Sequence, residues 1–247
     1  MNNNLQKQGK ETVERLILEG YEVPYFLISG SHLYGTANEN SDVDFRGVFF
    51  AKFNNRVGFS YKDDIDFGED GKLYEVKKFV KLLADNNPNI LEWAFAPKSN
   101  VFRLDPDFKE IVFKDKQQFI NPARIQVKFI GYCMSEMSRL KKLNGKTGEK
   151  RRKIMEKYGY NTKSASNVMR IACGGIDLIS HGHLKLPYEN RELLSDIKSG
   201  KYTFEEVMSI VMPKVEKLRS FTGLEDKSEE VLGYAQGVLI SYIKAKM

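Results

Sequence analysis

Two aspartates separated by one residue, Asp42 and Asp44, are the strongest candidates for chemistry in this chain. They stand at the start of an apolar run that predicts a strand over residues 43–51. Side chains two apart on a strand point to the same side, about 6.6 Å apart along the backbone. Two carboxylates held that close are poorly placed to ionise together without a cation. We therefore expect them to bind a divalent ion, Mg²⁺ or Mn²⁺, whose coordination shell phosphates can complete.

A second motif, Gly30-Ser31, follows an apolar strand and precedes a short helix. Glycine lets the backbone approach a ligand, and the serine N–H and hydroxyl can donate to phosphate oxygens at the start of a helix. We expect Gly30 and Ser31 to bind phosphate groups. Tyr34 and Thr36 are expected to stabilise the turn or to contact a sugar. Arg46 is expected to meet a nucleotide phosphate or to pair with an acid.

The order Gly30-Ser31, Tyr34-Gly35-Thr36 and Ser41-Asp42-x-Asp44 resembles the nucleotidyltransferase signature of the DNA polymerase beta superfamily. Later segments are similar to one branch, the predicted nucleotidyltransferases of bacteria and phages, some of them associated with RNA repair; these segments are residues 74–79, 87–93 and 158–163, with Arg170. The resemblance spans nearly the whole chain. It implies an α+β fold in which a polymerase-beta-like domain, a small mixed sheet with flanking helices, is followed by a helical bundle.

The resemblance also implies a third carboxylate, which helps to bind one ion and accepts the proton of the attacking hydroxyl. In the family branch this acid stands four positions before the aromatic residue that is Tyr74 here, and that spacing selects Asp70. Asp66 remains an alternative, because Gly68 and Gly71 bracket Asp70 and weaken the strand signal around it. An acidic surface hairpin without a chemical role is the competing interpretation.

Three basic residues match positions that are basic in the family. Lys78 falls on an amphipathic helix expected over residues 74–84 and could approach a triphosphate. Lys163 and Arg170 are seven residues apart, so they fall on the same side of a helix expected over residues 161–181. The resemblance implies that these two bind phosphate of the nucleotide or of the acceptor.

The chain of 247 residues is 41% hydrophobic and can bury a core as one large domain or as two smaller ones. We expect two, a nucleotidyltransferase domain over residues 1–115 and a helical domain over residues 116–247. No apolar run approaches the roughly 18–20 residues of a membrane span, and the N-terminus lacks a signal-peptide core. We therefore expect a soluble, cytoplasmic protein.

The net charge of +6 is unevenly distributed along the chain. Residues 1–100 carry 12 Lys and Arg against 15 Asp and Glu, a net charge of −3, whereas residues 101–247 carry 27 against 18, a net charge of +9. Residues 141–153 alone contain seven positive side chains and one negative. Such a run can neutralise phosphates of a polynucleotide, although it is also typical of a solvated loop.

These features predict a metal-dependent nucleotidyltransferase that transfers a nucleoside monophosphate from a nucleoside triphosphate to a hydroxyl acceptor and releases pyrophosphate. RNA, such as a tRNA end or an RNA under repair, is the favoured acceptor. One alternative is an enzyme of the toxin–antitoxin type that nucleotidylates a protein, and another is a non-catalytic module that binds nucleotide or RNA. The preferred base and the oligomeric state stay open.

Overall fold

The computed structural model describes residues 3–39, 41–52, 54, 59, 61–141 and 148–247. The chain divides into two compact units. The first, here called the sheet unit, comprises Met1–Ile120 together with Ser228–Met247, and the second, the helical unit, comprises Asn121–Lys227. Residues 142–147, which belong to the basic run over residues 141–153, lie outside the described residues.

The sheet unit is built on a five-stranded sheet in the order β3-β4-β2-β1-β5. Its strands are β1 (Glu22–Ile28), β2 (Phe45–Phe50), β3 (Asp64–Phe67), β4 (Gly71–Glu75) and β5 (Val101–Leu104). β2 and β4 run parallel, and the other neighbouring strands run antiparallel. This mixed sheet with flanking helices, joined to a helical part, confirms the expected α+β fold class. β5 is a short edge strand that was not expected from the sequence.

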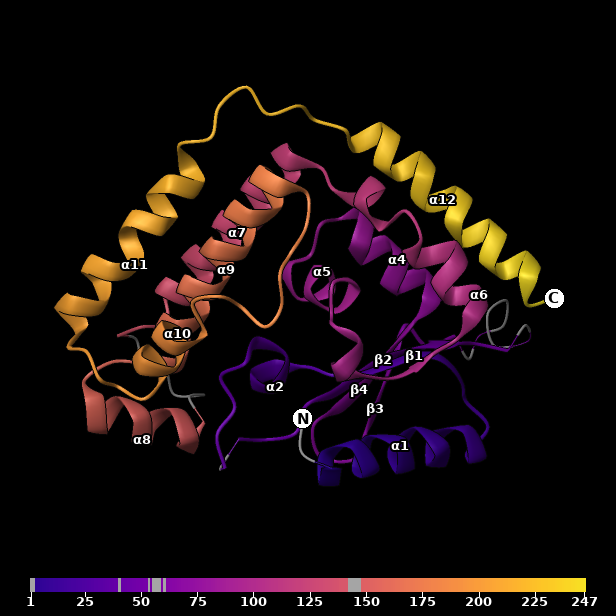
Figure 1. Ribbon diagram of the computed structural model, residues 1–247, viewed down its shortest axis with the longest axis horizontal. Coiled ribbons are helices and arrows are strands. Elements are labelled where there is room, and N and C mark those ends of the chain that lie inside the picture. The colour runs from indigo at the N-terminus through magenta and orange to yellow at the C-terminus, as the bar shows by residue number, and fades with distance from the viewer. Residues whose placement is uncertain (1–2, 40, 53, 55–58, 60, 142–147) are drawn as a thin grey trace. The chain divides into compact units, whose positions relative to one another are not determined.

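Side chains along β1 alternate between the two faces of the sheet. Phe26 and Ile28 belong to the core cluster that contains Val13 of α1 (Asn3–Leu18). Tyr25 points to the opposite face, where its ring lies 6.4 Å from that of Phe79 on α4 (Val76–Ala84). Helix α1 therefore covers one face of the sheet and α4 the other (Figure 1).

Short helices and turns follow the strands of the sheet unit; they are α2 (Gly30–Tyr34), α5 (Pro88–Ala94), η1 (Lys98–Asn100), α6 (Pro106–Phe108), η2 (Lys109–Phe113) and η3 (Lys116–Phe119). Helix α4 begins later than its apolar pattern suggests, because Glu75 caps its N-terminus. The buried Glu75 carboxylate accepts a hydrogen bond from the Lys77 N–H at 2.6 Å. Tyr74, expected at the start of this helix, therefore lies on β4.

The closing helix α12 (Ser228–Ala245) packs on the sheet unit, although the sequence analysis assigned it to the C-terminal domain. The Tyr242 ring is fully buried and lies 5.5 Å from Phe50 of β2 and 5.3 Å from Phe108 of α6. Nearer the start of α12 lies Tyr234, whose ring is 5.0 Å from that of Phe119. Aromatic packing thus returns the end of the chain to the sheet unit.

The helical unit consists of helices that pack around α9; they are α7 (Pro122–Met137), α8 (Glu149–Tyr158), α9 (Thr162–His181), α10 (Arg191–Lys198) and α11 (Phe204–Arg219). α9 is buried on most sides, which agrees with its run of small and apolar residues. Asn161 caps it by accepting a hydrogen bond from the Ser164 N–H at 3.1 Å.

Among the described residues, no helix combines the length and the apolar character needed to cross a bilayer.

Candidate active site

A close approach between Gly30 and Asp44 defines the start of the candidate site. Gly30 begins α2 with a φ of +61°, in the left-handed region. A Cβ atom added to Gly30 would lie 2.1 Å from Asp44 Oδ2. The Ser29 N–H donates to the Asp44 carbonyl at 2.8 Å, which holds the two segments together. Glycine is therefore required here both by the backbone conformation and by the carboxylate that rests against it.

We expect Gly30→Ala to lower the free energy of unfolding by about 1–3 kcal/mol, because alanine would have to adopt a left-handed conformation and displace the Asp44 carboxylate. Urea unfolding of the full chain measures this loss. Gly68→Ala is the matched control, because Gly68 has a φ of +57° and nothing within 4 Å of an added Cβ. An equal loss of stability in the two variants would contradict the steric part of the argument.

Asp44 and Asp70 lie at the same end of the sheet because β2 and β4 run parallel. Arg46 is paired in register with Lys72, and the same register continued two residues back sets Asp44 beside Asp70. Arg46 connects the two segments: its Nη2 lies 3.2 Å from Asp44 Oδ1, and its Nη1 donates to the Asp70 carbonyl. Of the two roles expected of Arg46, the structure therefore contains the pairing with an acid.

Asp42 and Asp44 precede β2, which begins at Phe45, although both were expected on the strand. Asp42 is exposed, whereas the Asp44 side chain is only 30% exposed and is engaged by Arg46 and Gly30. The two carboxylates expected to face one spot thus have different surroundings. The reason is that β2 begins only at Phe45, so the strict alternation of a paired strand does not extend to Asp42 and Asp44.

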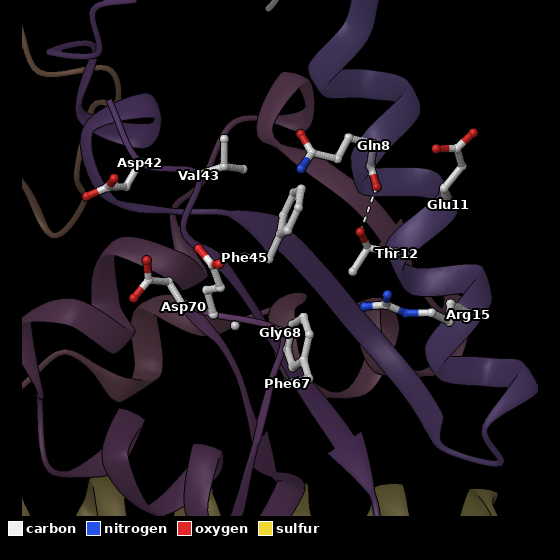
Figure 2. A pocket seen from close by; sticks show the side chains of 12 residues that line it. Gln8, Glu11, Thr12, Arg15, Asp42, Val43, Phe45, Phe67, Gly68 and Asp70 are labelled. Carbon is white, nitrogen blue, oxygen red and sulfur yellow. Dashed lines mark hydrogen bonds between the residues drawn. The ribbon is translucent and has the colours of Figure 1, made fainter. Parts of the chain in front are cut away.

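Asp42 and Asp70 line a pocket of about 560 Å³ between α1 and the β3–β4 turn, here called the α1 pocket. Figure 2 shows the rings of Phe45 and Phe67 between the two aspartates on one side and α1 side chains, including Gln8, on the other. Because these elements all belong to the sheet unit, the pocket is formed within one compact body. It gives Asp42 and Asp70 access to a ligand of small-molecule size.

The two candidates for the third carboxylate have different surroundings on the β3–β4 hairpin. Asp70 lies in the turn between the strands, is exposed and lines the α1 pocket. Asp66 lies on β3, where its Oδ1 is 2.9 Å from Lys72 Nζ, and it does not line this pocket. Of the two candidates for the third carboxylate, Asp70 is therefore the one that lines the pocket, and it is also the one that the family spacing selects.

Oxygen donors that suit Mg²⁺ or Mn²⁺ are available at this end of the sheet. Asp42, Asp44 and Asp70 supply three carboxylates, and Arg46 engages only one oxygen of Asp44. Within the described part of the chain, no group of three or more His, Cys, Asp or Glu side chains is gathered closely enough to hold a metal ion. The donor chemistry fits a divalent cation, whereas the three carboxylates do not form a preassembled cluster.

Ser31, Tyr34 and Thr36 lie on and just after α2, as the motif implied. The Thr36 N–H donates to the Ser31 carbonyl at 2.9 Å, and Gly35 between them ends the helix with a φ of +78°. Thr36 is buried, whereas Ser31 and Tyr34 are half-buried. This local geometry agrees with a turn-stabilising position for Thr36 and leaves the Ser31 side chain partly accessible.

Lys78 lies on α4 but is engaged within the sheet unit. It forms an ion pair with Asp64 of β3, and its Nζ lies 5.0 Å from the centre of the Tyr74 ring. The hydrogen bond from Lys78 holds the pKa of the Asp64 carboxyl below its usual range, aided by Lys72. To contact a triphosphate, Lys78 would have to leave the Asp64 carboxylate or bind both at once.

A polar contact that the sequence analysis did not identify supports the β1–α2 turn from behind. Ser29 is buried, and its Oγ accepts a hydrogen bond from the Trp93 indole N–H at 3.0 Å. The Tyr25 hydroxyl donates to the Trp93 carbonyl at 2.6 Å, and the Trp93 ring stacks on Tyr74 with centroids 5.5 Å apart. The match of residues 87–93 to the family was the only sequence signal for this support.

Lys163 and Arg170 lie on α9 in the helical unit, where the helix was expected. Lys163 is exposed, whereas Arg170 is only 6% exposed. The two residues are two turns apart and were expected on the same side of the helix. Their side chains nevertheless have different environments. Lys163 is the more accessible of the two for an external phosphate.

The charge asymmetry follows the two compact units. The helical unit carries 21 Lys and Arg against 12 Asp and Glu, a net charge of +9, which leaves −3 for the sheet unit out of the total of +6. α8 contributes the exposed Lys153 and Arg152 of the basic run. The candidate carboxylates thus belong to an acidic unit, and the basic excess belongs to the other unit.

Comparison with known proteins identifies similarity over most of the chain. The model of a family described as RNA repair pathway DNA polymerase beta family matches residues 5–223. The chain is also similar to an uncharacterized 38.9 kDa protein from the nrdC-mobD intergenic region of Enterobacteria phage T4. That similarity is 30% identity over 127 residues and covers 44% of this chain and 36% of the phage protein. The chain therefore spans just over a third of the length of this relative.

Proposed function

Because the chain belongs to the RNA repair pathway DNA polymerase beta family, we propose that it is a metal-dependent nucleotidyltransferase acting on RNA. It would transfer a nucleoside monophosphate from a nucleoside triphosphate to a hydroxyl of the acceptor and release pyrophosphate. The observation that carries this proposal is that Arg46 contacts both the Asp44 carboxylate and the Asp70 carbonyl at one end of the sheet, with Asp44 directly beside the Gly30-Ser31 turn. Polymerase-beta-type chemistry needs carboxylates close to groups that donate hydrogen bonds to the phosphates of the nucleotide.

In the proposed reaction an acceptor oxygen forms a bond to the α-phosphorus, and the bond from that phosphorus to the bridging oxygen of pyrophosphate breaks. Asp70 orients the acceptor hydroxyl and takes its proton. Gly30 and Ser31 bind the departing phosphates through backbone N–H groups and the serine hydroxyl. Asp42 and Asp44, with Asp70, would hold Mg²⁺ or Mn²⁺, which supplies neutralisation of phosphate charge when bound.

Other side chains are assigned by the same proposal to positioning of the nucleotide. Tyr34 would contact the sugar, with Thr36 holding the turn beneath it. Arg46 has one guanidinium nitrogen on Asp44 and another on backbone carbonyls, so it would orient Asp44 and contact phosphate at the same time. Lys78 would contact phosphate while sharing Asp64.

The helical unit is proposed to bind the acceptor. Its net charge of +9 supports RNA over a neutral small molecule, because cationic side chains gain affinity for a polynucleotide by releasing counterions from its phosphates. Lys163, which is exposed, would contribute to this phosphate contact, whereas Arg170 is buried and would have to become accessible to do so. The proposal predicts that RNA binding weakens as salt rises, with a slope set by the number of phosphates neutralised.

The experiment that tests the function incubates the full chain with each α-³²P-labelled nucleoside triphosphate, Mg²⁺ or Mn²⁺, and a mixture of tRNA and total protein. We expect label on RNA and release of unlabelled pyrophosphate, both abolished by a metal chelator. Label on polypeptide would instead identify a protein-nucleotidylating enzyme. Nucleotide binding without pyrophosphate release under all conditions would identify a non-catalytic module, which the lack of a preassembled carboxylate cluster in the described residues would then explain.

A further inference from the structure

The α1 pocket does not include the residues of the proposed phosphate site. Asp42 and Asp70 line it, but Gly30, Ser31 and Asp44 do not. Phe45, which lines the pocket, belongs to the face of β2 that packs with α1, whereas Asp44 precedes it by one residue and is engaged by Arg46. A ligand in the α1 pocket would therefore meet the acid proposed to receive the acceptor proton, without occupying the triphosphate position.

The chemistry of the pocket suits a nucleoside. Its volume of about 560 Å³ is within the range of small-molecule sites. Phe67 offers a half-buried aromatic ring, packed from behind by Phe26 at 6.0 Å, on which a base can stack. Gln8 of α1 is exposed at the opposite wall, where its amide can pair with the edge of a base. Arg15, lower on the same wall, adds a planar guanidinium (Figure 2).

The charges of the pocket disfavour a phosphate. Four carboxylates line it and only one guanidinium does so; the carboxylates belong to Glu11, Asp42, Glu69 and Asp70. The guanidinium of Arg15 is also 3.8 Å from the Glu19 carboxylate. Carboxylates accept hydrogen bonds from ribose hydroxyls but repel phosphate oxygens. The lining is therefore complementary to a sugar that ends in free hydroxyls.

We propose that the α1 pocket binds the terminal nucleoside of an RNA acceptor, selecting an end with free hydroxyls over an end that carries a phosphate. The inference rests on the proposed function in assigning Asp70 to the acceptor hydroxyl. The base lies against Phe67 and Gln8, and the ribose hydroxyls face Asp42 and Asp70. The rest of the RNA leaves the pocket, so its phosphates do not enter this acidic region.

The test measures binding of a short RNA with a fluorescein at its 5′ end to the full chain, by anisotropy and without nucleoside triphosphate. Two RNAs of the same sequence are compared, one with a free 3′-hydroxyl and one with a 3′-phosphate. We expect the hydroxyl form to bind about tenfold more tightly to the unmodified chain, the scale of one stacked and hydrogen-bonded nucleoside. Equal affinity for the two ends, or no RNA binding at all, would overturn the proposal.

Gln8→Trp fills the pocket from an exposed position of α1, and Lys10→Trp is its matched control, exposed on the same helix but outside the pocket lining. We expect Gln8→Trp to abolish the preference for the hydroxyl end, and Lys10→Trp to keep it. Phe67→Ala should also reduce it, and a thermal melt checks that this variant remains folded. An unchanged preference in Gln8→Trp contradicts the assignment of the pocket.

Affinity for ATP, measured separately with a fluorescent ATP analogue, distinguishes the two substrates. A loss of ATP affinity in Gln8→Trp with unchanged RNA affinity would assign the pocket to the triphosphate substrate and overturn the proposal. Failure of the proposed function is recognised differently. In that case the unmodified chain transfers no label to RNA, although end-selective RNA binding and its loss in Gln8→Trp persist.

Discussion

Asp44→Ala is expected to lower the rate of nucleoside monophosphate transfer by roughly 10³-fold while leaving the chain folded. A carboxylate that holds a divalent ion beside the reacting phosphate contributes several kcal/mol of charge stabilisation, and each 1.36 kcal/mol corresponds to about a tenfold change in rate. The measurement is the single-turnover transfer of label from an α-³²P-labelled nucleoside triphosphate to RNA at saturating Mg²⁺.

Asp64→Ala is the matched control for this prediction. Asp64 is the first residue of β3. Its side chain is 29% exposed against 30% for Asp44, and it is likewise ion-paired, with Lys72 and Lys78. If loss of an ion pair were the whole effect, the two variants would lose activity equally. We expect Asp64→Ala to stay within about tenfold of the unmodified chain, since an ion pair at this exposure contributes little. Equal losses would remove Asp44 from the chemistry.

Asp70→Asn is expected to lower the same transfer rate by about 10²- to 10³-fold, the usual contribution of a positioned proton acceptor. Asparagine keeps the size of the side chain but cannot accept the proton of the acceptor hydroxyl. Asp66→Asn on the same hairpin should change the rate by less than about threefold, because Asp66 is exposed and pairs with Lys72, and the energy of such a pair is small.

The pair of variants decides between the two candidates for the third carboxylate. A larger loss in Asp66→Asn than in Asp70→Asn would transfer the role to Asp66. Binding of nucleoside triphosphate, measured for both variants, should be nearly unchanged in Asp70→Asn if this side chain acts on the acceptor. A loss of nucleotide affinity as large as the loss of rate would contradict that assignment.

Local sequence determined several elements directly. The spacing of Val76, Phe79, Val80 and Leu83 predicted the helix that the structure contains as α4, and its amphipathic face is buried as expected. Thr203 and Glu206 form the capping box that begins α11. These features depend on residues within a few positions of one another, so their energetics are present in the local sequence.

Other features depended on residues far apart in the chain. β5 was missed because four residues of an edge strand carry little periodic signal, and its pairing partner β1 lies more than 70 residues earlier. The position of α12 was missed for a similar reason. An amphipathic pattern predicts that a helix packs on a core, but it does not identify the element against which the helix packs. Tyr242 reaches Phe50 and Phe108 only in the folded sheet unit.

The candidate site divides in the same way. The sequence by itself determined its residue types: the glycine that a left-handed turn requires, the aspartates of residues 42 and 44, and a spacing that selected Asp70. Only the tertiary structure decided that the segments of Asp44 and Asp70 come together, because β2 and β4 are parallel neighbours and Arg46 contacts both residues. It also placed Asp42 in the lining of the α1 pocket and Asp44 against Gly30. Strand alternation could not foresee that difference, because it applies only within a paired strand and β2 begins after both residues.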